Sequence, residues 1–104
     1  MVEDSFEITQ AIEDGICRFT VKGRIDTNSA DEFQSKMEDA LKNGQKIIIL
    51  NMSSVEYLSS IGIRVILKIY KQAAEADGSL KIEQPSEIVS NVLNMVALKE
   101  MIVK

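Results

Sequence analysis

Residues 47–65 read IIILNMSSVEYLSSIGIRV, and the change of pattern inside this stretch decides the fold. It begins with four consecutive aliphatic residues, Ile47 to Leu50, which is typical of a central parallel strand covered on both faces. A connection from Asn51 to Leu58 follows. From Ile61 onward, apolar residues recur at intervals of three and four, which predicts a long amphipathic helix that begins near Ser60. A buried strand that leads into such a helix indicates an α/β domain.

The residues before this stretch predict a hairpin and a first helix. Apolar and polar residues alternate on both sides of Asp14 and Gly15, which predicts two antiparallel strands joined by a tight turn. After Gly23, the polar stretch 24–29 leads into a helix that ends near Gly44. The apolar positions of this helix share one face, and they are Ala30, Phe33, Met37, Ala40 and Leu41.

The residues after this stretch complete one domain. The long helix should end near residues 77–78. The elements expected beyond it are a short alternating strand at 80–83, a helix that starts at Pro85 and Ser86, and a last helical turn containing Leu98, Met101 and Ile102. The order β-β-α-β-α-β-α predicts a single domain over residues 1–104. Its mixed sheet should have four strands, an N-terminal antiparallel hairpin plus parallel strands, packed with three to four helices.

Composition excludes several functions. The chain has 104 residues, 16 acidic and 12 basic side chains and a formal net charge of −4, which argues against nucleic acid and anionic membranes as partners. It contains no histidine, the commonest general base and metal ligand. Cys17 is the single cysteine, expected to be a buried and unreactive thiol. We expect no metal and no cofactor. The acidic N-terminus and the absence of a long apolar run favour the cytoplasm.

Polar residues follow two of the predicted strands. Asp26 comes just after the second strand, and Ser59 and Ser60 stand between the third strand and the long helix. Because the carboxyl ends of parallel strands meet at one edge of a sheet, we expect these two loops to lie close together.

Ser60 has two interpretations. A serine at the start of a helix commonly caps it by accepting a hydrogen bond from a backbone amide. The same position favours negative charge, so a phosphate on Ser60 would be stabilised, and Gly62 would leave room around the amides. Arg64 and Lys68 form a basic stripe nearby, which is either solvent-facing surface or a contact for an acidic partner.

Three segments carry a resemblance to a known family. Gly23–Asp26, Ile47–Asn51 and Tyr57–Val65 resemble the STAS domain of bacterial anti-sigma factor antagonists, in the same order and at the same spacing. The resemblance extends over almost the entire chain. It implies a cytoplasmic protein, expected to be a monomer, that is not an enzyme.

The resemblance also implies a partner switch. In this family the unmodified protein binds an anti-sigma factor, a serine kinase of the histidine-kinase-like ATPase fold, and so frees the sigma factor. The kinase phosphorylates a serine of the antagonist, binding is lost, and a PP2C-type phosphatase restores it. The acceptor corresponds to Ser60, with Ser59 as second choice where the family usually has aspartate. The implied partner-binding residues are Asp26, Thr27, Ser59, Ser60, Ile61, Gly62 and Arg64.

Two other functions stay open. One is a scaffold that is never phosphorylated, or a regulator of a larger complex in secretion, motility or biofilm control, in which the serine only caps the helix. The other is a small hydrolase or phosphotransfer protein that uses Ser60 and Asp26, for which no base or cofactor motif is present.

Overall fold

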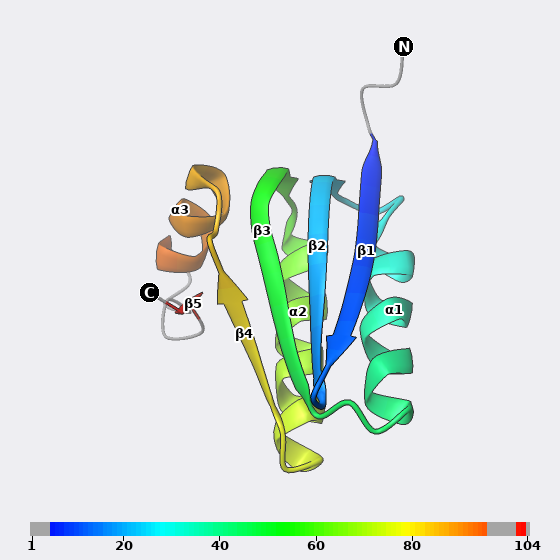
Figure 1. The fold of residues 1–104 in the computed structure, drawn as a ribbon. Coiled ribbons are helices and arrows are strands. Elements are labelled where there is room, and N and C mark those ends of the chain that lie inside the picture. Colours follow the sequence, from blue (N-terminus) through cyan, green and yellow to red (C-terminus); the bar gives the residue numbers. More distant parts are fainter. Residues whose placement is uncertain (1–4, 96–101, 104) are drawn as a thin grey trace.

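The computed structural model describes residues 5–95 and 102–103 and shows a mixed sheet with two long helices packed against it (Figure 1). The elements are β1 (Phe6–Glu13), β2 (Ile16–Ile25), α1 (Ala30–Lys42), β3 (Ile47–Leu58), α2 (Ser60–Glu75), β4 (Ser79–Glu83), α3 (Glu87–Met95) and β5 (Ile102–Val103). The strands lie in the order β1-β2-β3-β4-β5. β1 pairs antiparallel with β2, and every other neighbouring pair is parallel. The predicted α/β architecture is therefore confirmed.

The carboxyl-terminal end differs from the sequence prediction. Ile102 belongs to the short strand β5, which pairs parallel with Ile82 and Glu83 of β4, so the predicted helical turn is wrong at this residue. Leu98 and Met101 lie outside the described residues. The four predicted strands are present, and β5 adds a fifth, two-residue strand at the edge. The edge of β4 has backbone groups free to pair, and an extended segment satisfies them where a helical turn could not.

β3 is longer than predicted, because the supposed connection from Asn51 to Leu58 continues the strand. Its register with β2 shifts twice: Thr20 and Lys22 pair with Asn51 and Ser54, and a second shift follows Gly23. At each shift β3 contains one extra residue, which is a β-bulge. The buried side chains of β3 therefore change spacing from two to three along the strand, and they are Ile48, Leu50, Met52, Val55 and Leu58.

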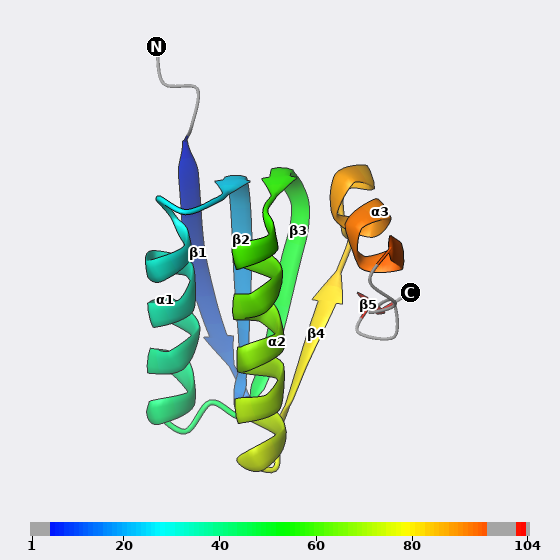
Figure 2. The same cartoon turned by 180° about the vertical axis from the view of Figure 1, so that it is seen from behind.

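Both long helices cover the same face of the sheet. Figure 2 shows α1 and α2 side by side in front of the strands. The strand order runs in one direction and parallel crossovers are right-handed, so successive helices fall on one side. The expectation that Ile47–Leu50 is covered on both faces is wrong, because Ile48 and Leu50 are buried whereas Ile47 is 39% exposed. One face of the sheet is left without a long helix.

The core lies between the other face and these helices. Cys17, Phe19 and Val21 of β2 point into it, and Phe33 of α1 packs edge-to-face on Phe6 of β1. Cys17 is fully buried, as predicted, and desolvation raises the pKa of its thiol. α3 starts as predicted, with Ser86 Oγ accepting the Val89 amide at 3.3 Å, and packs beside β3 (Figure 1). In the part of the chain described, no helix has the length and apolar character needed to cross a membrane.

Candidate functional site

The two polar loops meet at the carboxyl edge of the sheet. Ile25 at the end of β2 is paired in register with Leu58 at the end of β3. The backbone amide of Ser59 donates to the carbonyl of Ile25 at 2.9 Å, so the parallel pairing continues to the first residue of the connection to α2. The expectation that these loops lie close together is confirmed.

Ser59, and not Ser60, caps α2. Ser59 has an extended backbone (φ −80°, ψ 169°), and its Oγ accepts the amide of Gly62 at 3.3 Å. Ser60 is the first residue of the helix, is exposed, and makes no side-chain hydrogen bond within the described residues. The capping interpretation of Ser60 is therefore wrong. A side chain can reach the first-turn amides from the cap position, but in the first helical position it points outward to solvent.

Gly62, which the sequence predicts as a partner-binding residue, is buried. A Cβ atom at this position would lie 2.7 Å from Cγ2 of Ile25 and 2.7 Å from Cδ1 of Leu58. The missing side chain therefore lets α2 approach the ends of β2 and β3 closely, and it does not open space around the helix amides as the sequence suggested.

The loop after β2 is held by its own polar side chains. Oδ1 of Asp26 accepts the amide of Asn28 at 3.0 Å. The hydroxyl of Ser29, a buried residue, donates to the carbonyl of Arg24 at 2.7 Å and accepts the amide of Asp26 at 3.0 Å. The Asp26 side chain is only 21% exposed, whereas Thr27 is exposed. Asp26 thus shapes the loop that presents Thr27.

Arg24 and Tyr57 add an aromatic contact that the sequence did not reveal. The guanidinium of Arg24 lies 4.3 Å from the centroid of the Tyr57 ring, and its Nε lies 3.7 Å from Oδ2 of Asp26. Arg24 and Tyr57 are register partners on β2 and β3, so only the strand pairing could have identified this contact. The arrangement fixes an aromatic ring, 40% exposed, at the edge of the site.

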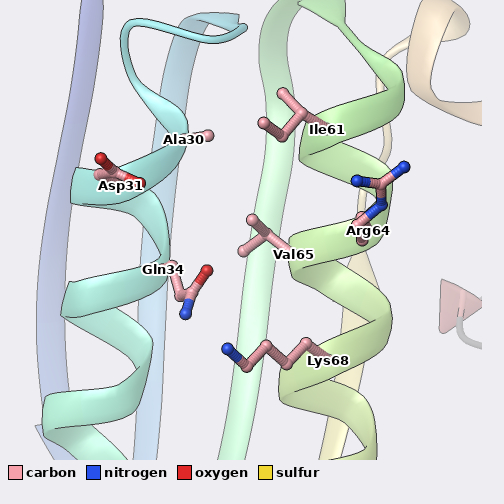
Figure 3. Close-up of a pocket in the computed structure, with 7 residues that line it drawn as sticks. All are labelled: Ala30, Asp31, Gln34, Ile61, Arg64, Val65 and Lys68. Atoms are coloured by element: carbon pink, nitrogen blue, oxygen red, sulfur yellow. The ribbon is translucent and has the colours of Figure 1, made fainter.

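A groove runs between the amino-terminal halves of α1 and α2 (Figure 3). Its volume is about 220 Å³, and it begins at Ile61, the residue after Ser60. Ile61 and Arg64 were predicted as partner-binding residues, but the contribution of α1 was not, because it depends on how the helices pair. The lining residues are Ala30, Asp31, Gln34, Ile61, Arg64, Val65 and Lys68.

The start of α2 exposes the hydroxyl of Ser60, and the described residues place no proton acceptor against it. Ser60 lies at the positive end of α2, where negative charge is favoured. Within the described residues, no acid or base is hydrogen-bonded to its Oγ, and the chain has no histidine. The site can therefore receive an anionic group on Ser60 and offer the groove to another molecule.

The sequence and the structure both match known proteins. The STAS domain matches residues 7–104. The anti-sigma-B factor antagonist of Bacillus subtilis is 29% identical over 82 residues, which are 79% of this chain and 74% of that protein. BtrV of Bordetella bronchiseptica is 25% identical over 67 residues, 64% of this chain and 58% of that protein, so the match spans little more than half of that relative.

The fold is also found among solved structures. The anti-sigma factor antagonist SpoIIAA in its unphosphorylated form aligns with a TM-score of 0.82 over 95% of this chain and 86% of that chain, at 18% identity. This likeness concerns the fold, whereas the domain match covers nearly all of the sequence. The chain belongs to the STAS domain family.

Proposed function

We propose that this chain is an anti-sigma factor antagonist whose binding to its anti-sigma factor is abolished by phosphorylation of Ser60. The observation that carries the proposal is the exposed hydroxyl of Ser60 at the amino-terminal end of α2, beside the groove between α1 and α2. Among the described residues this hydroxyl has no hydrogen bond. The name of the Bacillus subtilis relative, an anti-sigma-B factor antagonist, supports the same role. The binding surface comprises Thr27, Ile61 and Arg64 around the acceptor, with Ser59 and Asp26 shaping it.

The helix can accept the phosphate without refolding. Phosphate on Ser60 adds negative charge where the helix dipole favours it, and the first-turn amides are oriented toward that end. Ser59 keeps the cap, since serine and aspartate are comparably good at this position. The substitution of Ser59 for the family's usual aspartate therefore preserves the helix start, although it removes a carboxylate beside the acceptor.

The loss of binding follows from charge. Phosphorylation changes the formal net charge from −4 to about −6. At an interface that fits a neutral hydroxyl, desolvating and repelling a dianion costs about 3–5 kcal/mol. This is a loss of affinity of roughly 10²-fold to several times 10³-fold, since 1.4 kcal/mol corresponds to about tenfold. A PP2C-type phosphatase would restore the binding form.

Phosphorylation by the anti-sigma factor tests the proposal. The purified protein is incubated with ATP and its cognate serine kinase, and the modified residue is mapped by mass spectrometry. We expect one phosphate on Ser60, none in Ser60→Ala and one in Ser59→Ala. The proposal fails if wild-type protein gains no phosphate and Ser60→Asp binds the kinase as tightly as wild type, in which case an unphosphorylated scaffold explains the fold.

The oligomeric state is tested alongside. We propose that the chain acts as a monomer that exchanges between partners, and analytical ultracentrifugation before and after phosphorylation should give one species of the monomer mass. A dimer that dissociates on modification would contradict the exchange of a single chain.

A further inference from the structure

Arg64 follows Ser60 by one helical turn and is an exposed residue with no ion pair among the described residues. Figure 3 shows its guanidinium turned toward the amino-terminal end of α2, whereas the ammonium of Lys68 extends toward α1 near Gln34. Both residues line the groove. Of these two cationic side chains, Arg64 is therefore the one that is directed toward the end of α2 where Ser60 lies.

We propose that Arg64 binds the phosphate of phospho-Ser60 in an ion pair within α2, and that this pair occupies the guanidinium that the unmodified protein leaves available to a partner. The inference rests on the proposed phosphorylation and adds a second component to it. In the unmodified protein the guanidinium is available to a carboxylate of the partner at the groove. After modification the same group is occupied by the chain's own phosphate.

Helix geometry brings the two groups together. Side chains four residues apart lie on the same face with Cβ atoms about 5–6 Å apart, and an anion that precedes a cation at this spacing is the favourable orientation. A guanidinium can donate two parallel hydrogen bonds to phosphate oxygens. Lys68 lies about 12 Å from Ser60 along the axis at 1.5 Å per residue, beyond direct contact with a phosphate there.

The other charges that the described residues place near this end of α2 do not compete for the phosphate. The Arg24 guanidinium is stacked on Tyr57 and lies beside Asp26. Asp31, on the α1 side of the groove, repels a phosphate. The helix dipole acts on the phosphate as well, but it is the same in every variant of Arg64 or Lys68, so a comparison of variants isolates the ion pair.

The test uses protein with phosphoserine installed at position 60 during synthesis, so that no kinase is required. The second ionisation of the phosphate, ordinarily near pH 6, is followed by ³¹P NMR in the full chain. We expect it about 0.2–0.4 pH units lower in wild type than in Arg64→Gln, the size of an exposed pair at this spacing. Arg64→Lys should restore part of the difference. Lys68→Gln, which removes the same charge one turn further on, should titrate like wild type.

Two results would overturn the inference: equal titration of wild type and Arg64→Gln, or an equal change in Lys68→Gln, which would indicate a general charge effect. Circular dichroism of each variant verifies that the helix is folded during the titration. Because the phosphate is installed chemically, failure of the kinase to modify Ser60, together with wild-type binding by Ser60→Asp, would refute the proposed function and leave this result unaffected. The converse result, phosphorylation without the pH difference, would refute only the ion pair.

Discussion

The adjacent serines at the start of α2 should respond in opposite ways to the same substitution. Ser59→Ala removes the Oγ that accepts the Gly62 amide at 3.3 Å and leaves that amide without its cap. Loss of a serine cap costs about 1 kcal/mol, and the long hydrogen bond places this case toward about 0.5–1 kcal/mol. Ser60→Ala removes an exposed hydroxyl that caps nothing. Alanine is the better helix former, so this variant should gain up to about 0.5 kcal/mol.

Thermal and urea unfolding of the two variants, followed by far-ultraviolet circular dichroism, measure this contrast. For a domain of this size, 1 kcal/mol corresponds to roughly 4–8 °C in Tm, so Ser59→Ala should melt about 2–8 °C below wild type. Ser60→Ala should melt at or slightly above the wild-type temperature. Ser59→Asp, which retains a capping oxygen, is the matched control and should stay near wild type. The assignment of the cap is refuted if Ser60→Ala is destabilised as much as Ser59→Ala.

Three further changes probe the fold. Gly62→Ala places a Cβ atom 2.7 Å from Cγ2 of Ile25. The cost of overpacking, about 1–3 kcal/mol, should exceed the gain in helix propensity of about 1 kcal/mol, so the variant should be less stable. An unchanged urea midpoint would contradict the close approach. Burial raises the pKa of Cys17 above its ordinary 9.0, so the folded state holds this proton more tightly than the unfolded chain. The resulting stabilisation is fully present below pH 9 and is lost as the pH rises through the folded-state pKa. Urea midpoints at pH 7 and 10 should therefore differ more in wild type than in Cys17→Ala, and equal differences would show that the thiol does not contribute. Arg18→Gln breaks the exposed ion pair between Nε of Arg18 and Oε2 of Glu83, which are 3.0 Å apart. The free energy of unfolding should fall by less than about 1 kcal/mol, and this difference should disappear in 1 M salt. A larger or salt-independent loss would mean that Arg18 acts through packing.

The strands that alternate regularly could be predicted from the sequence, and the bulged strand could not. β2 buries every second residue from Cys17 to Ile25, so its pattern has the period of a strand. In β3 the buried residues after Met52 are three apart, because each bulge inserts a residue that has no partner on β2. A spacing of three resembles a helix or a loop when the neighbouring strand is unknown.

The candidate site was predictable where it depends on topology. The rule that parallel strands end at one edge of the sheet correctly brought Asp26 and Ser59 together, and the structure joins their loops by the bond from Ser59 to Ile25. Whether Ser59 or Ser60 caps α2 depends on which residue begins the helix, and either serine could occupy the cap position judged by its residue type alone. The α1 side of the groove depends on how two helices pack, which no local motif encodes.

The face of the sheet opposite α1 and α2 provides an attachment point remote from the loops around Asp26 and Ser60. Thr9 of β1 is exposed, and alternation along the strand directs it away from Phe6 and Ile8, which pack on the core. The native thiol, Cys17, is sealed in that core and will react slowly. The substitution Thr9→Cys therefore allows a dye to be attached selectively to the face of the sheet opposite the helices. Fluorescence anisotropy can then follow binding and dissociation of a partner without steric interference from the dye.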